Sequence, residues 1–322
     1  MYIRCFPAGY RLPGMGTLGK LIEVFLSEDK DRIRRNAMFK KLFCLVAFAA
    51  ILYVPSTGLA DFTPVLGTAQ DFAVLAYSGI TNTGSTTITG DVGSHPTGTV
   101  TGQADITLLT GAYHLADDVA NTAKTDLSTA YTALNNMTPT QTLLTNQLGG
   151  RTLTSGVYAF QGGPDPILLD GILTLDAEGN NNAYWVFQIP AALITGNSSS
   201  VVFEDFGSNG GSDNGLFWTV GSSAGIFGST SFQGNILAYA SINLYNSATI
   251  MHGRALAQNG TVTMDTNTIS FLCYNGGPGL SGGLTYDENG DVVPVPVPGA
   301  LLLACSGMGS ALAFGRRFFS VS

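Results

Sequence analysis

Basic side chains are scarce in the long central part of this 322-residue chain. Between Asp61 and Asp291 there are only Lys124, Arg151 and Arg254 against eighteen acidic side chains, a net charge of −15. Such a surface repels phosphate backbones, so we expect no nucleic acid among the partners. The same scarcity argues against a polysaccharide-active β-helix enzyme such as a lyase. That class needs a cluster of acidic or basic catalytic residues in one groove.

Cysteine is equally rare, with four residues in the whole chain. Cys5, Cys44 and Cys305 lie in segments that we expect to be removed or embedded in a membrane. Only Cys273 then remains in the mature domain, which excludes an internal disulfide. Packing and backbone hydrogen bonds must therefore stabilise the fold.

Motifs for catalysis and for metal binding are lacking as well. The sequence contains no nucleophile elbow, phosphate loop or dinucleotide fingerprint. No metal-type spacing or neighbouring Cys or Glu accompanies the three histidines, His95, His114 and His252. We therefore expect a non-enzymatic protein that binds no metal and no cofactor.

The N-terminal region has the pattern of an export signal. Met38-Phe39-Lys40-Lys41 precedes an apolar run from Leu42 to Val54, and Gly58-Leu59-Ala60 provides a small-residue cleavage site. We predict a signal peptide at 38–60 and an exported, extracellular or cell-surface protein. Residues 1–37 are interpreted either as an extension that precedes the true start at Met38 or as a long charged n-region.

The C-terminal apolar run is about fifteen residues, which is short for a free transmembrane helix of ~20. Val-Pro-Val-Pro-Gly, the apolar run and Arg316-Arg317 together resemble a PEP-CTERM sorting tail, although the usual acidic residue between the prolines is missing. That resemblance implies contact with export and sorting machinery and transient contact with the membrane. A simple C-terminal membrane anchor is the alternative for residues 293–322, and a Gly-rich linker is expected at 275–292.

What the sequence does contain is short β-like units with threonine at alternate positions. Thr99-Val100-Thr101-Gly102 is typical, because residues i and i+2 of a strand share a face and the valine between them faces the core. Stacked in a parallel sheet, such units give a flat, rigid and weakly polar surface that repeats every ~4.7 Å. The alternative explanation of this pattern is that threonine in strands reflects β-propensity and solubility alone.

Two further patterns predict the architecture of residues 61–274, the expected mature domain. Apolar residues spaced three and four apart predict one amphipathic helix over 112–135. Gly234-Asn235-Ile236-Leu237-Ala238 and Gly253-Arg254-Ala255-Leu256-Ala257 lie 19 residues apart and look alike. That period fits one turn of a β-solenoid with three short sides.

Several stretches, in order along the chain, resemble the bacterial and fungal ice-binding proteins. They are LGTAQDFAVLA at 66–76, TITGDVG at 87–93, LTSGVY at 153–158, WVFQI at 185–189, FWTVGSSA at 217–224, FQGNILA at 232–238 and HGRALAQNG at 252–260. The resemblance implies a mainly β fold, a discontinuous right-handed parallel β-helix (solenoid) with one long α-helix packed alongside.

The resemblance also implies that one flat β-face with outward Thr, Ser and Ala binds ice. Carried onto this chain, that face comprises Thr81, Thr101, Leu168, Ile194, Gly225, Asn243 and Thr263, with Thr99, Ser241 and Thr261 in a neighbouring column. It carries no charge, which suits ice, and the strand spacing is comparable to repeats on ice planes. The expected function is that of an exported ice-binding protein. The alternative is an interaction protein of the cell envelope or biofilm matrix that keeps the fold without ice affinity.

Overall fold

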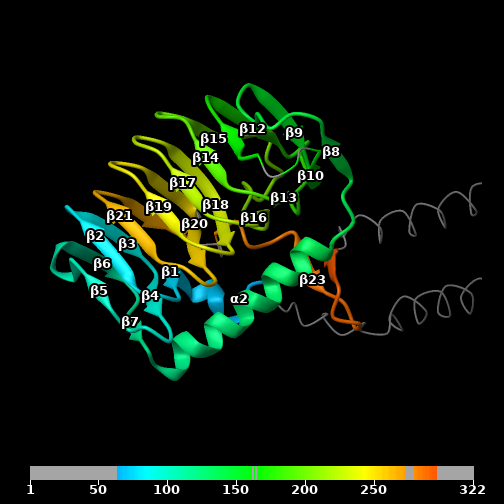
Figure 1. Cartoon of the computed structure of the whole chain (residues 1–322). Helices are drawn as coiled ribbons and strands as arrows, with labels where there is room; N and C mark the ends of the chain where they lie inside the picture. Colours follow the sequence, from blue (N-terminus) through cyan, green and yellow to red (C-terminus); the bar gives the residue numbers. More distant parts are fainter. Residues whose placement is uncertain (1–63, 162, 164, 273–278, 296–322) are drawn as a thin grey trace, which may run out of the picture. The chain divides into compact units, whose positions relative to one another are not determined.

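The computed structural model describes residues 64–161, 163, 165–272 and 279–295. The predicted extension at 1–37, the signal peptide at 38–60 and the tail from residue 296 onward lie outside these residues. The predicted mainly β fold with parallel strands and one long helix is confirmed (Figure 1). Among the described helices, none combines the length and apolar character needed to span a membrane.

A seven-stranded parallel sheet forms one side of the stack. Its strands are short, and neighbours in the sheet come from distant parts of the chain. In sheet order they are β11 (Ile167–Leu169), β14 (Leu193–Thr195), β17 (Ala224–Ile226), β19 (Ile242–Leu244), β21 (Val262–Asp265), β2 (Ile80–Thr83) and β5 (Val100–Thr101).

A fifteen-stranded sheet forms the rest of the stack, and all its strand pairs are parallel. Its strands are β1 (Phe72–Ala76), β3 (Thr86–Thr89), β4 (Asp91–Ser94), β6 (Ile106–Thr110), β7 (Tyr113–Leu115), β8 (Gln141–Leu143), β9 (Arg151–Thr154), β10 (Gly156–Phe160), β12 (Ile172–Asp176), β13 (Tyr184–Ile189), β15 (Ser200–Glu204), β16 (Gly215–Val220), β18 (Ser231–Ala238), β20 (Thr249–Ala257) and β22 (Thr268–Ser270). Two 3-10 turns, η1 (Gly67–Asp71) and η2 (Gln103–Asp105), complete the connections.

The 19-residue recurrence seen in the sequence corresponds to neighbouring strands. Asn235 of β18 is the register partner of Arg254 in β20, and Leu237 is the partner of Leu256. Both strands bend at a glycine, Gly234 or Gly253, where the register shifts. A Cβ atom added to Gly253 would collide with the Gly234 carbonyl, so the two strands approach closely because residue 253 is a glycine. At Gly234, a Cβ atom would collide with the Leu216 side chain, and its φ of +92° suits glycine.

Aromatic and aliphatic side chains fill the interior between the sheets. Phe187 and Trp218, register partners in β13 and β16, stack with ring centroids 4.1 Å apart, and Tyr158 stacks on Phe187 at 5.3 Å. All three side chains are completely buried. Such ladders of like side chains fix the register of the strands that carry them.

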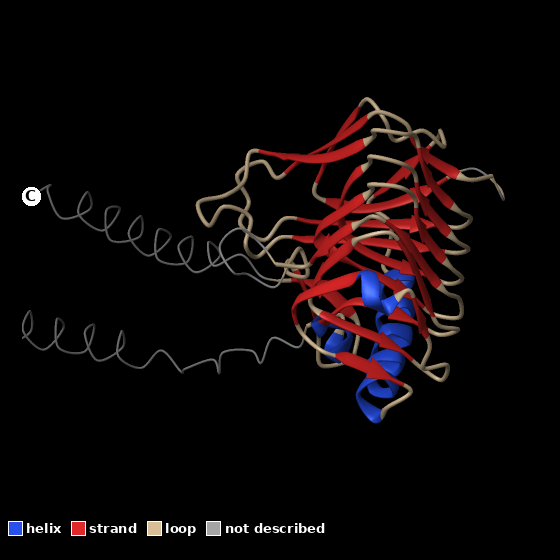
Figure 2. Cartoon of the chain, turned by 90° about the vertical axis from the view of Figure 1, so that its left-hand side faces the viewer, coloured by secondary structure: helices blue, strands red, loops and turns tan. Residues whose placement is uncertain are grey.

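The helix α2 (Asp118–Asn136) lies along the stacked strands (Figure 2). Its buried face, Ala123, Leu127, Ala130 and Leu134, belongs to one apolar cluster with outward residues of the fifteen-stranded sheet such as Phe217. The Gln188 amide of β13 donates to the Leu134 and Met137 carbonyls at 2.8 Å each, which satisfies the C-terminal end.

The helix begins six residues later than the predicted start at 112. Tyr113–Leu115 pair with β4 as strand β7, and the Asp117 carboxylate accepts from the Ala120 N–H at 2.8 Å as an N-cap. The pKa of Asp117 is lowered chiefly by that hydrogen bond. Val119, expected on the packed stripe, is 47% exposed.

The structure also differs from the linker expected at 275–292. Within its described part, β23 (Leu284–Tyr286) and β24 (Val292–Pro294) form an antiparallel hairpin. Leu284 and Val292 are buried in the same cluster as the apolar face of α2. The hydroxyl of Tyr286 donates to the Val65 carbonyl at 3.1 Å. Gly290 lies in the turn between these two strands with a φ of +82°, and its N–H donates to the Asp287 carbonyl at 3.0 Å.

Lys124 connects α2 to the turn that follows β20. Its ammonium group donates to the Ala257 and Gln258 carbonyls at 2.5 and 2.7 Å and lies 5.6 Å from the ring centroid of Tyr77. Burial lowers the pKa of Lys124 from 10.5 to about 7. Between those values the unfolded chain carries a proton that the folded protein has lost, so stability rises with pH.

We therefore expect the free energy of unfolding to increase between pH 7.5 and 9.5, by at most ~1.4 kcal/mol per pH unit. Lys124→Met should remove this increase, because methionine keeps much of the stem and has no titratable group. Chemical denaturation across the pH range measures the slope. Equal slopes in parent and variant would contradict the assignment to Lys124.

Candidate functional site

The outer surface of the seven-stranded sheet is built by strict alternation of buried and outward side chains. In β2, Ile80 and Asn82 are buried, whereas Thr81 and Thr83 are exposed. The other strands repeat this pattern, as in β21, where Val262 and Met264 are buried and Thr263 is partly exposed. Inward, mostly aliphatic residues thus hold the strands against the core, and each strand presents an outward position, which in β17 is Gly225.

The seven central positions predicted from the sequence fall in a single register row. Each is the register partner of the next, in the order Leu168, Ile194, Gly225, Asn243, Thr263, Thr81 and Thr101. We call this set the first row. Six strand spacings give it a length of about 29 Å. The structure therefore brings together residues that lie as far apart in the sequence as Thr81 and Thr263.

The side chains of the first row are accessible and uncharged. Thr81, Thr101 and Leu168 are exposed, and the others are partly exposed. Within the described residues, the hydroxyls of Thr81, Thr101 and Thr263 have no protein hydrogen-bond partner, so they can bind water or an external lattice. The strand backbones beneath them are held by parallel ladders on both sides, except at the two edges of the sheet.

The predicted neighbouring column is also present, with one addition and one gap. The Thr261 hydroxyl donates to the Ser241 hydroxyl at 3.4 Å, and the Ser241 N–H donates to the Ser223 hydroxyl at 3.3 Å. Ser223 was missed, although it precedes Gly225 by two residues as Ser241 precedes Asn243. Gly79 interrupts the column beside Thr99, and its φ of +105° suits glycine.

Charge occurs only at the rim of this surface. Asp265, two residues after Thr263, is the register partner of Thr83, and its carboxylate accepts from the Thr266 hydroxyl at 3.0 Å. Asp170 follows Leu168 by two residues and is exposed. The first row itself is electrically neutral over its whole length, which suits an uncharged, ordered ligand better than an ion.

Comparison with known proteins places this surface in context. A family model described as "Ice-binding-like" matches residues 74–270. An ice-binding protein of Nostoc sp. (strain HG1) is 39% identical over 287 residues, covering 89% of this chain and 98% of that protein. The chain belongs to the ice-binding-like family. An ice-binding protein of Flavobacterium frigoris (strain PS1) is 30% identical over 221 residues, covering 64% of this chain and 75% of that protein.

Solved structures agree with this family assignment. The ice-binding protein of the Antarctic ascomycete Antarctomyces psychrotrophicus superimposes with a TM-score of 0.58 and 39% sequence identity, covering 64% of this chain and 97% of that one. A DUF3494 domain of Shewanella frigidimarina ice-binding protein 1 gives a TM-score of 0.52 at 28% identity. In this family member, the first row departs from an all-threonine array at one end.

That end of the first row is apolar. Leu168 is 41% exposed, Ile194 adjoins it, and Gly225 contributes no side chain. Phe227 and Tyr245 flank the gap with ring centroids 4.5 Å apart, and a Cβ atom on Gly225 would lie 3.5 Å from the Phe227 ring. These aromatic residues were not foreseen, because their approach to Gly225 depends on the pairing of β17 with β19.

The three basic side chains of the described residues, other than histidine, have structural surroundings. Lys124 is held by carbonyls near α2, Arg151 donates to the Gln147 carbonyl at 2.7 Å, and Arg254 is buried. Arg254 donates to Asn235 Oδ1 at 2.7 Å, a bond between neighbouring strands β20 and β18. No group of three or more His, Cys, Asp or Glu side chains that could hold a metal occurs in the described residues.

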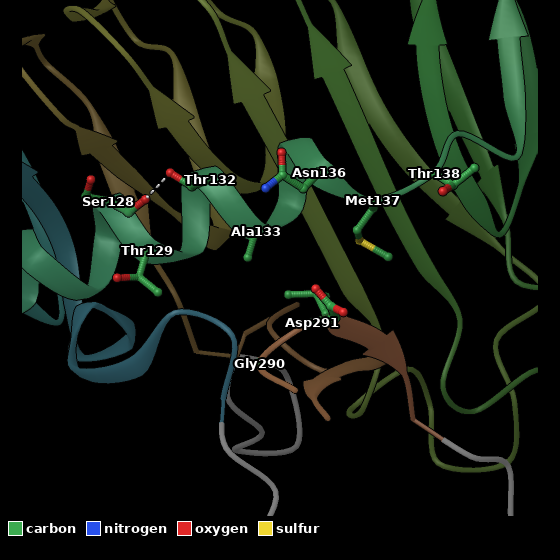
Figure 3. A pocket seen from close by; sticks show the side chains of 10 residues that line it. Ser128, Thr129, Thr132, Ala133, Asn136, Met137, Thr138, Gly290 and Asp291 are labelled. Atoms are coloured by element: carbon green, nitrogen blue, oxygen red, sulfur yellow. Dashed lines mark hydrogen bonds between the residues drawn. The ribbon is translucent and has the colours of Figure 1, made fainter. Parts of the chain in front are cut away.

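A cavity of about 630 Å³ lies between α2 and the β23–β24 hairpin (Figure 3). Its walls are hydroxyl groups of the helix, including Ser128, Thr129 and Thr132, with Asp291 on the hairpin side. The Thr132 hydroxyl donates to the Ser128 carbonyl at 2.9 Å, a bond internal to the helix. Asp291 is the single carboxylate among the residues that line this cavity.

The gap at Gly225 leads to a stability prediction. Gly225→Ala should raise the free energy of unfolding by about 0.5–1 kcal/mol, because glycine is unfavourable within a strand and the added methyl meets ordinary contacts. Gly253→Ala is the matched control and should destabilise, since its methyl collides with the Gly234 carbonyl. Denaturant unfolding of both variants measures the difference. A strongly destabilised Gly225→Ala would show that the aromatic residues close this gap more tightly.

Proposed function

We propose that this protein is an exported ice-binding protein that adsorbs to ice through the first row and its neighbouring column. The proposal rests on the register of the strands in the seven-stranded sheet. Seven outward positions, identified by the family resemblance, lie on one uncharged row of a parallel sheet. The two relatives from Nostoc sp. and Flavobacterium frigoris are ice-binding proteins, which supports the same activity.

The chemistry of the row suits an ice surface. Ice offers ordered oxygen atoms and no net charge, so a charged side chain would keep its own hydration and spoil the match. Thr263, Thr81 and Thr101 present adjacent hydroxyl and methyl groups from three neighbouring strands. A hydroxyl can exchange a water hydrogen bond for one to a lattice oxygen, while the methyl groups and the Leu168–Ile194 end release water on contact.

The architecture supplies the rigidity that such a contact needs. We infer that the strands form a right-handed β-helix with three sides, one of which α2 covers. The parallel register throughout the two large sheets and the 19-residue recurrence at Asn235 and Arg254 support this description. Side chains on a backbone with two-sided hydrogen bonding lose little further freedom when they meet ice.

The proposed location rests on the sequence patterns of residues 38–60 and 293–322. We infer secretion through the signal peptide at 38–60, with the C-terminal segment acting as a sorting tail or as a membrane anchor. The protein would then meet ice outside the cell or at its surface.

N-terminal sequencing of secreted material should begin at or near Asp61, because the small residues before it suit a signal peptidase. Recovery of an uncleaved chain from the cytoplasm would contradict export.

The first row can be tested at its hydroxyl-rich end. Thr81→Tyr should abolish adsorption at this face, because a ring would stand several ångströms above a surface that must lie flat. Thr81→Ser keeps the hydroxyl, loses the methyl and should weaken activity only partly. Thermal hysteresis and ice recrystallisation assays on the exported chain measure the effect, and thermal unfolding checks the fold. Exposed substitutions usually change stability by less than ~0.5 kcal/mol.

Asn121→Tyr on the exposed side of α2 is the matched control and should leave ice activity unchanged. Unchanged activity at every concentration in a folded Thr81→Tyr would show that the first row is not the binding surface. A folded parent without any ice activity would favour the alternative, an interaction protein of the cell envelope or matrix on the same scaffold.

A further inference from the structure

A second register row runs across the helix-free part of the fifteen-stranded sheet. Each member is the register partner of the next, in the order Thr107, Thr87, Thr268, Thr249, Ser231, Ser200 and Ile172. We call this set the second row. It crosses seven strands, β6, β3, β22, β20, β18, β15 and β12, and is therefore about as long as the first row.

The second row faces outward. The residues that follow its members in the strands, such as Ile88, Ile269 and Ile250, are completely buried. Thr107, Thr268, Ser231 and Ile172 are exposed, and the remaining three are partly exposed. The neighbouring outward residues Thr174, Val202, Gln233, Met251 and Ser270 are also uncharged. These two columns are thus neutral, and the second row carries four threonines where the first row has three. Carboxylates follow only beyond them, at the register partners Asp176 and Glu204 of β12 and β15.

The hydroxyls of this strip are available to an external partner. Within the described residues, the Thr249 hydroxyl makes one long bond, a donation to the Thr230 carbonyl at 3.5 Å. Those of Thr87, Thr107, Thr268, Ser200 and Ser231 make none there. This contrasts with the third side of the stack, where outward Leu75, Val186, Phe217 and Leu256 are covered by α2.

The two rows are joined by a rigid corner. Two-residue connections link β2 to β3 and β21 to β22. Buried Asn267 donates its side-chain amide to the Tyr245 and Ala248 carbonyls at 3.0 and 2.9 Å, and its N–H to the Thr86 hydroxyl at 3.1 Å. Thr195 and Thr230 share a further buried hydrogen bond of 3.0 Å. These bonds fix the angle between the two surfaces. The surface of the second row therefore adjoins that of the first row along this corner.

We propose that the second row is a second ice-contacting face, so that one molecule presents two ice-binding surfaces across one corner. This rests on the proposed function and extends it to residues outside the first row. The physical requirements are the same: a parallel sheet, no charge, and free hydroxyls beside methyl groups, on a side that α2 does not cover. At the β15–β18 end the row borders a cavity of about 310 Å³ that Ser231 lines together with Phe206 and Gly211. The second row meets these requirements more regularly than the first row, since Ile172 is its only member without a hydroxyl.

Ice fits this strip better than other classes of ligand. A polyanion or polycation would need charge of the opposite sign, which neither this row nor the strip beside it carries. Carbohydrate recognition commonly uses exposed aromatic rings, and the two outward columns of this side contain none. The chemistry that remains is an ordered, uncharged lattice of hydrogen-bonding oxygens. Because the two surfaces meet at an angle, they address differently oriented planes of ice.

The test uses fluorescently labelled full-length chain, purified after export, on a single-crystal ice hemisphere. The variants are Thr81→Tyr in the first row, Thr268→Tyr in the second, the double variant, and Asn121→Tyr as control. We expect the parent to label two sets of planes, each single variant to lose a different set, and the double variant to lose both. Ser231→Tyr gives an independent substitution in the second row in case position 268 affects folding.

The outcomes separate the two proposals. Folded Thr268→Tyr and Ser231→Tyr with labelling equal to that of the parent would overturn the second face and leave the proposed function intact. Loss of all labelling in Thr268→Tyr, with Thr81→Tyr unaffected, would support the second row and reject the first. A folded parent that labels no plane would overturn both. Thermal unfolding of every variant confirms that losses do not arise from misfolding.

Discussion

The surfaces of this protein depend on one constraint, the register of its parallel strands. A slip of one residue would turn every side chain to the opposite face, placing Ile80 and Val262 outside and Thr81 and Thr263 inside. Completely buried ladders oppose such a slip, notably the stack of Phe187 on Trp218 and the aliphatic partners Ile88, Ile269 and Ile250. The core therefore fixes the outer rows by holding the residues between them.

The helix α2 covers the outward face of one part of the fifteen-stranded sheet. Outward residues on the covered side are large and apolar, such as Phe217 and Leu256, and α2 buries them with a face of alanine and leucine. Lys124 and Gln188 then fix the helix through backbone carbonyls. Arg254 ties β20 to β18 and to residues before β23 through Asn235 and Gly279. Polar contacts of this kind supplement the apolar packing of the fold.

The sequence allowed the first row to be predicted because the resemblance aligned each central residue with a family position. Local patterns were less reliable. The spacing of apolar residues predicted that the helix starts at 112, whereas Asp117 is the N-cap of α2. The abundance of glycine predicted a linker, whereas Leu284 belongs to a packed hairpin. The second row could not be predicted from the sequence. In Thr86-Thr87-Ile88-Thr89, only Thr87 belongs to the second row. Thr86 is fully buried and Thr89 nearly so, a distinction that depends on pairing with β22 and β6.

An uncharged surface gains little from any single contact, so ice adsorption requires many weak contacts to form together. Rigidity makes this feasible, because side chains that are already ordered on a sheet lose little further conformational entropy on binding. The first row is neutral but uneven, with hydroxyls at Thr263, Thr81 and Thr101 and an apolar end at Leu168 and Ile194. A second neutral row across a corner fixed by Asn267 adds area without disturbing the first. For a ligand that is itself an extended lattice, added area is the most direct route to stronger adsorption.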